Sequence, residues 1–225
     1  MIEVTDIWKR YKHKSVLEGV SFSAAPGECV GIAGGNGCGK TTLFSVLSGT
    51  VRADKGSMKY QGQEILGSRR ILSDCIAYVP QENPLMEELS AKDNLRLYYR
   101  GDKKKMEEDL DHGTAAMLGI GDFLGTDVGR LSGGMKKRLS IACALSNHAP
   151  VLIMDEPGAA LDLICKEEIR NYLVKYMAAG GTVLLASHEL EELSLCSKLY
   201  VLNHGKLEQA PTGLSAGELV SRFEK

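Results

Sequence analysis

Short apolar runs, each bounded by polar, glycine or proline residues, recur along the chain. The clearest are 28–33, 75–79, 151–154 and 182–186. A run of this length is typical of a strand buried within a sheet, whereas a helix needs a longer pattern. Segments with a helical pattern separate several of these runs. The pattern of apolar and polar positions therefore predicts an α/β fold.

The N-terminal part of the chain predicts a β-rich edge to this fold. The apolar positions of 2–8 indicate a first strand, and those of 16–22 indicate a second. The basic segment 9–14 is expected to form the turn between them. A further hairpin is expected at 57–60, where a turn signal follows. These strands are expected to pair as an antiparallel edge.

A helical subdomain is expected to interrupt the α/β core. Ser90 precedes one helical pattern and Ser132 precedes another. A serine at such a position is a good N-cap, because its hydroxyl accepts a hydrogen bond from an N–H group of the first turn. The single domain 1–225 is therefore expected to comprise the core segments 1–83 and 148–225 and the inserted helical segment 84–147.

A glycine-rich segment after the run 28–33 matches G-x-x-x-x-G-K-[ST] and leads into a helical pattern. Glycines let successive N–H groups turn toward phosphate oxygens, beside the positive end of the following helix. Lys40 adds a charge for the β and γ phosphates of a nucleotide, and the Thr41 hydroxyl can bind Mg²⁺. The alternative is a glycine-rich turn followed by an unrelated Lys-Thr pair. The expected nucleotide-binding residues are Gly34, Gly35, Asn36, Gly37, Cys38, Gly39, Lys40, Thr41 and Thr42.

Two adjacent acids follow the run 151–154, and Pro157 then prevents the strand from continuing. Asp155 is a candidate for holding Mg²⁺, as expected of the acid paired with a phosphate loop. Glu156 can accept a proton from an attacking water. The alternative is a turn with two solvated acids.

Three further polar or aromatic residues are candidates for the same site. Gln81 follows the run 75–79 and can contact a metal ion or the attacking water, unless it is an ordinary loop residue. His188 follows the run 182–186 and can donate a hydrogen bond to the γ-phosphate. Tyr11 can stack on an adenine ring, or it can pack on its neighbours in the turn.

A second anion site is expected where the sequence Ser132-Gly133-Gly134 opens a helical run. The first N–H groups of a helix have no partner within the helix and can bind an anion. A merely flexible helix start is the alternative, and only the surrounding motifs favour the anion site.

The composition restricts the class of protein. The 225 residues, 44% of them hydrophobic, suffice for one sizeable domain, and the apolar runs are far shorter than the roughly eighteen residues that span a bilayer. An N-terminus with early acidic residues argues against a secretory signal, so a cytosolic location is expected. The net charge of −2 does not favour a nucleic-acid partner. The six cysteines include no C-x-x-C pair, so neither a zinc site nor a disulfide framework is expected.

Taken in order, these motifs resemble the ATP-binding subunits of ABC transporters over essentially the whole chain. The segments that match the family are the phosphate loop 34–42, the Q-loop residue Gln81, the signature 131–135, the acidic motif 151–156, the D-loop 160–162, the switch histidine His188 and the aromatic Tyr11. Three positions depart from the common family pattern. Met135 replaces the usual glutamine of the signature, Gly158-Ala159 replace a pair of hydroxyl residues before the D-loop, and Cys143 stands where an arginine is frequent. The missing D-loop hydroxyl puts in doubt one hydrogen bond between chains, worth about 1 kcal/mol.

The resemblance implies a mechanism and a set of partners. Two ATPase chains, identical or different, would pack head to tail, with each ATP held between the phosphate loop of one chain and the signature helix of the other. ATP and Mg²⁺ are the implied cofactors. A separate transmembrane permease is the implied partner, which would hold this chain on the cytoplasmic face of the membrane.

The residues that follow the signature bear on the direction of transport. A signature followed by basic residues, here 136–138, is similar to that of some bacterial efflux systems. Export by an ATP-hydrolysing subunit is therefore the expected function. A soluble ABC-type ATPase that powers assembly or remodelling is the runner-up. A non-hydrolysing adaptor is a third possibility, and Glu156 argues against it.

Overall fold

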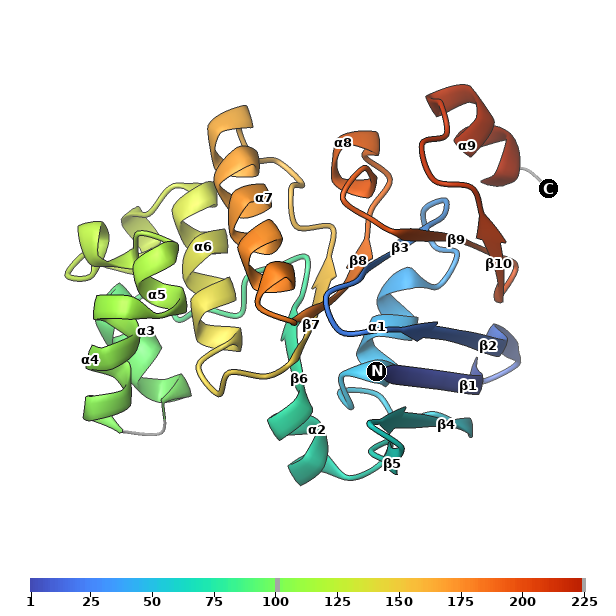
Figure 1. Cartoon of the computed structure of the whole chain (residues 1–225), viewed down its shortest axis with the longest axis horizontal. Helices are drawn as coiled ribbons and strands as arrows, with labels where there is room; N and C mark the ends of the chain where they lie inside the picture. Colours follow the sequence, from blue (N-terminus) through green and yellow to red (C-terminus); the bar gives the residue numbers. More distant parts are fainter. Residues whose placement is uncertain (100–101, 224–225) are drawn as a thin grey trace.

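The computed structural model describes residues 1–99 and 102–223, which fold into two sheets with flanking helices (Figure 1). The strands are β1 Ile2–Tyr11, β2 Lys14–Ala24, β3 Cys29–Ala33, β4 Lys55–Tyr60, β5 Gln63–Glu64, β6 Ile76–Val79, β7 Val151–Asp155, β8 Thr182–Ala186, β9 Lys198–Asn203 and β10 Lys206–Ala210. The helices are α1 Lys40–Leu47, α2 Arg69–Cys75, α3 Ala91–Tyr98, α4 Lys103–His112, α5 Thr114–Met117, α6 Gly133–Ala144, α7 Leu163–Ala178, α8 Leu190–Leu193 and α9 Ala216–Phe223.

The larger sheet has the strand order β10-β9-β3-β8-β7-β6, and the smaller has the order β2-β1-β4-β5. In the larger sheet the strands from β9 to β6 run parallel, and β10 pairs antiparallel with β9. The smaller sheet is antiparallel throughout. The predicted α/β fold with an antiparallel β edge is therefore confirmed.

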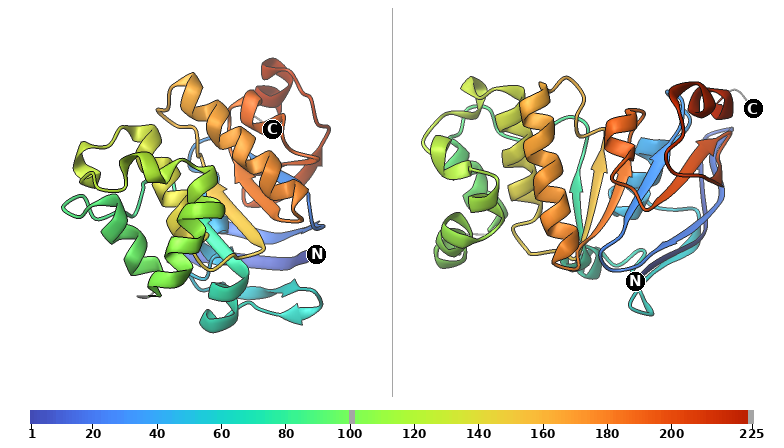
Figure 2. Two further views of the ribbon diagram at one scale, coloured as in Figure 1. Left: turned by 60° about the vertical axis from the view of Figure 1, so that its left-hand side comes forward. Right: turned by 45° about the horizontal axis from the view of Figure 1, so that its top comes forward.

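The central strands form where the apolar runs predict them, because both faces of the larger sheet are covered. Every residue of β3, β7 and β8 is buried. Along β7, Val151 and Ile153 face a core shared with α1 and the antiparallel sheet, while Leu152 and Met154 face a core shared with α6 and α7. Helix α1 thus lies on one face of the parallel sheet and α7 on the other (Figures 1 and 2).

Two details of the sequence prediction are wrong. Segment 9–14 is not the turn: β1 continues to Tyr11, β2 begins at Lys14, and only Lys12 and His13 separate them. Both faces of the hairpin tip are exposed, so the sequence there carries no apolar alternation to mark the strands. Cys75 belongs to the end of α2 rather than to the strand, which begins at Ile76.

The segment 84–147 contains α3 to α6 and lies at the end of the molecule away from the antiparallel sheet (Figure 1). The Ser90 hydroxyl accepts a hydrogen bond from the Asp93 N–H, and the Ser132 hydroxyl accepts one from the Met135 N–H, so both predicted caps are confirmed. Between 1–99 and 102–223, none of the helices combines the length and apolar character that a bilayer span requires.

Candidate active site

The phosphate loop connects the buried end of β3 to the first turn of α1. Gly34 is packed so closely that a Cβ atom there would lie 2.6 Å from the carbonyl oxygen of Leu202, and Gly39 has a φ angle of +117°. These two positions therefore require glycine. The Lys40 side chain is only 6% exposed, and its Nζ donates hydrogen bonds to the carbonyl oxygens of Gly34 at 2.8 Å and Gly35 at 3.4 Å.

Glu156 is the point at which the predicted site residues converge. Its Oε1 lies 3.5 Å from Lys40 Nζ and 3.5 Å from His188 Nδ1. Its Oε2 accepts a hydrogen bond from Gln81 Nε2 at 3.4 Å. Glu156, Gln81 and His188 follow the adjacent strands β7, β6 and β8, whose carboxyl ends meet at one edge of the sheet. The fold thus gathers around one carboxylate three residues that are far apart in the sequence.

Asp155 ends β7 and lies deeper than Glu156, with 1% of its surface exposed. Burial raises the pKa of Asp155 and the Glu156 carboxylate adds to the rise, whereas a hydrogen bond with Thr41 and the charges of Lys40 and Lys137 lower it. Its Oδ2 has no hydrogen-bond partner among the described residues. A buried carboxylate oxygen without a partner is costly unless a ligand satisfies it.

A cavity of about 540 Å³ opens beside these groups. It is lined by Tyr11, Val16, Asn36, Gly37, Gly39, Lys40, Thr41, Thr42, Gln81, Glu156 and His188. Tyr11 stands at its edge from the end of β1 and is 46% exposed. Val16 was not predicted, because a valine in an apolar strand carries no sign of a site. The lining includes the Lys40 cation and the glycines of the phosphate loop, which suit a polyphosphate ligand, and it also includes the Glu156 carboxylate.

Comparison with known proteins identifies the family. The family model described as "ABC transporter" matches residues 17–159, which include the phosphate loop, the signature and the acidic pair. The chain belongs to the ABC transporter family, as an ATP-binding subunit. This ABC ATPase therefore binds ATP and hydrolyses it.

Individual relatives extend the likeness over the whole chain. The Nod factor export ATP-binding protein I of Paraburkholderia xenovorans (strain LB400) is 36% identical over 223 residues, which cover 97% of this chain and 73% of that protein. A solved ATP-binding subunit of an ABC transporter superposes with a TM-score of 0.87 at 26% identity and covers both chains fully. CbiO1 from Clostridium perfringens, part of the ABC transporter complex cbiONQ, has a TM-score of 0.81 at 28% identity, covering 99% of this chain and 91% of its own.

In this ABC ATPase the signature residues Ser132, Gly133 and Gly134 do not line the cavity beside the phosphate loop of their own chain. Ser132 and Gly133 are exposed. Gly134 is buried against α7, where a Cβ atom would lie 2.0 Å from the Sγ of Cys165. The N-terminus of α6 is therefore accessible but separate from the phosphate loop.

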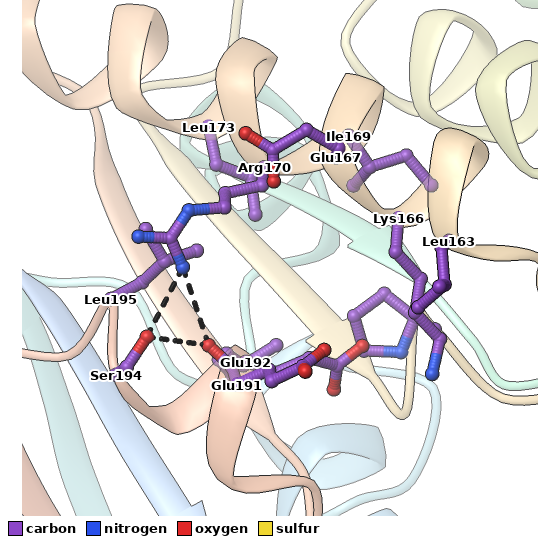
Figure 3. Close-up of a pocket in the computed structure, with 13 residues that line it drawn as sticks. Leu163, Lys166, Glu167, Ile169, Arg170, Leu173, Glu191, Glu192, Ser194 and Leu195 are labelled. Atoms are coloured by element: carbon purple, nitrogen blue, oxygen red, sulfur yellow. Dashed lines mark hydrogen bonds between the residues drawn. The ribbon is translucent and has the colours of Figure 1, made fainter. Parts of the chain in front are cut away.

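A second cavity of the ABC ATPase, about 330 Å³, lies between α7 and α8 beside Pro157 and Gly158 (Figure 3). Arg170 reaches across it, and its Nη1 donates to the Ser194 hydroxyl at 3.1 Å and to the Glu191 carbonyl at 3.4 Å. These bonds hold α8, which closely follows His188, against α7. No local pattern predicts these bonds, because the partners of Arg170 lie more than twenty residues away along the chain.

Proposed function

We propose that this ABC ATPase hydrolyses MgATP in the cavity beside the phosphate loop, with Glu156 as general base. The convergence of Lys40, Gln81 and His188 on this carboxylate carries the proposal. Glu156 would take a proton from the water that attacks the γ-phosphorus, while Gln81 orients that water or touches the metal ion.

The remaining residues have matching roles in binding. Lys40 would exchange its contacts with loop carbonyls for the β and γ phosphate oxygens, and the N–H groups of 34–42 would cradle the phosphates. His188 would donate a hydrogen bond to the γ-phosphate. Tyr11 would stack on the adenine ring from the edge of the cavity, where an exposed aromatic face is available.

Asp155 and Thr41 fit a Mg²⁺ ion. Asp155 presents a buried carboxylate oxygen without a partner among the described residues, and the Thr41 hydroxyl lowers the pKa of that carboxyl group. Carboxylate and hydroxyl oxygens are the ligands that Mg²⁺ prefers, and Gln81 is a further candidate. When bound, Mg²⁺ would neutralise charge on the β and γ phosphates.

Asp155→Asn is expected to raise the Mg²⁺ concentration for half-maximal ATP hydrolysis by roughly tenfold or more, because the amide keeps the shape but loses the charge that holds the ion. A titration of ATPase activity with Mg²⁺ measures the shift. Asp111→Asn, an exposed aspartate on α4, is the matched control and should titrate like wild type. An unchanged midpoint for Asp155→Asn would remove Asp155 from the metal site.

His188→Ala is expected to leave ATP binding within about twofold of wild type and to slow turnover by roughly 100-fold, since a lost contact to the transferring phosphate acts mainly in the transition state. The imidazole is 55% exposed, so its removal should not disturb the core. Fluorescent-nucleotide titration and steady-state kinetics separate the two effects, with His112→Ala on α4 as the control. Wild-type turnover would make His188 a structural residue only.

We further propose that two ATPase chains close on ATP head to tail. The exposed N-terminus of α6, with Ser132 and Gly133 at its start, lies outside the cavity of its own chain and would supply N–H donors to the γ-phosphate on a second chain. The missing hydroxyl at 158–159 would weaken this contact by one hydrogen bond.

We also propose that this ABC ATPase drives a separate transmembrane permease that exports its substrate. The Paraburkholderia relative is named for export, and CbiO1 belongs to a transporter complex. Purification of the native chain from detergent-solubilised membranes tests it: a polytopic membrane protein should copurify in stoichiometric amount. If the chain instead copurifies with a soluble assembly and without a membrane protein, the result would favour a soluble ABC-type ATPase that powers assembly or remodelling.

A further inference from the structure

Lys137 lies in the middle of α6, five residues after Ser132, and points into the protein instead of into solvent. Only 2% of its surface is exposed. Its Nζ donates hydrogen bonds to the carbonyl oxygens of Pro80 at 3.1 Å and Gln81 at 3.0 Å. The signature helix is therefore bonded directly to the main chain that presents Gln81.

The depth of this ammonium group sets it apart from its neighbours in the basic run. Lys136 forms an ion pair with the exposed Glu87 at 2.6 Å, which is an ordinary surface contact. Burial lowers the pKa of Lys137 to about 8, opposed by the charges of Asp155 and Glu192. A buried ammonium is costly unless its donors are satisfied, and here two carbonyls of one short segment satisfy two of them.

The contacts of Lys137 continue to the proposed base. The carbonyl of Gln81 is bonded to Lys137, and the side-chain amide of the same glutamine donates to Glu156 at 3.4 Å. At 3.4 Å this last hydrogen bond is near its useful limit, so a small shift of the main chain at Gln81 would break it. A displacement of about 1 Å in such an arrangement can cost up to roughly 100-fold in rate.

We propose that Lys137 is a positioning residue for ATP hydrolysis, which fixes Gln81 to helix α6 so that the placement of the signature helix sets the contact between Gln81 and Glu156. This inference rests on the proposed roles of Glu156 and Gln81. Through Lys137 and Gln81, the signature helix would thus influence the position of Glu156 in its own chain, in addition to its proposed contact with ATP on a second chain.

The first test compares two variants of similar size. Lys137→Met removes the donors and is expected to lower kcat about tenfold, with KM and nucleotide affinity within about twofold of wild type. Lys137→Gln keeps an amide donor and is expected to lower kcat only about threefold. Lys136→Met, one position earlier on the same helix, is the control and should match wild type. A lysine that serves only to fill space would give equal rates for the Met and Gln variants, which would overturn the proposal.

The second test places the same changes in a Gln81→Ala background. Because Lys137 acts through Gln81, Lys137→Met should lower kcat by less than about twofold there. A full tenfold loss in both backgrounds would show independent effects and overturn the inference. If Lys137→Met does not fold, Lys137→Gln takes its place, with a threefold loss expected in the wild-type background and none beside Gln81→Ala. Wild-type hydrolysis by Glu156→Gln would instead overturn the proposed function, so the two failures are distinguishable.

Discussion

Glu156→Gln is expected to lower ATP hydrolysis by 10²–10⁴-fold, which corresponds to roughly 3–5 kcal/mol of barrier, the usual contribution of a positioned general base. Glutamine keeps the shape and can still meet Gln81 and His188. It removes a negative charge 3.5 Å from Lys40, so ATP should bind at least as well as to wild type. Single-turnover hydrolysis and a nucleotide titration measure the two effects, and Glu208→Gln on the exposed face of β10 is the matched control.

The same variant tests the association of two chains. A protein that binds ATP but cannot cleave it should accumulate as a dimer in MgATP and return to monomer when the nucleotide is removed. Size-exclusion chromatography with light scattering on the isolated chain reports the change. A monomer at saturating ATP, even at raised protein concentration to offset the missing hydroxyl at 158–159, would count against the head-to-tail dimer. Hydrolysis at the wild-type rate would exclude Glu156 as the base.

Lys40→Ala is expected to weaken ATP binding by more than roughly 100-fold and to abolish both hydrolysis and ATP-dependent dimerisation. The variant loses the cation that we propose contacts the β and γ phosphates, and also the donor that binds the carbonyls of Gly34 and Gly35. Isothermal titration with MgATP measures the affinity, and a thermal melt checks that the loop change leaves the domain folded.

A surface lysine provides the control for this experiment. Lys14→Ala removes an exposed charge at the tip of the β1–β2 hairpin, close in sequence to Tyr11, and should bind ATP normally. Unchanged affinity in Lys40→Ala would contradict the nucleotide site itself. An equal loss in both variants would indicate general electrostatic attraction instead of a specific phosphate contact.

The sequence predicts well those parts of the fold that depend on local patterns. Nearly all residues of strands β3, β7 and β8 are apolar because both faces of the sheet are covered, so their runs are visible without any knowledge of their partners. The end of β1 lacks this signal because Lys9 and Arg10 are charged and because Arg10 and Tyr11, on opposite faces, are both exposed. The prediction of a turn at 9–14 failed for that reason.

The candidate site likewise combines residues that local motifs identify with contacts that only the tertiary fold creates. Motif spacing nominates Lys40, Gln81, Glu156 and His188, but only the order of strands at the sheet edge brings them around one carboxylate. The hydrogen bonds from Lys137 to the Gln81 segment cross more than fifty residues, and no local pattern marks them. Such contacts depend on tertiary packing, which a single sequence does not display.

The close approach of α6 and α7 at Gly134 has a mechanical consequence. The Sγ of Cys165 fills the position that a side chain at 134 would need, so one sulfur atom sets the spacing between the starts of the two helices. One of these starts is capped by Ser132 and the other by Asp162. The start of the signature helix and the start of α7, which follows the D-loop segment 160–162, therefore pack directly on each other, and a displacement of one is expected to carry the other with it.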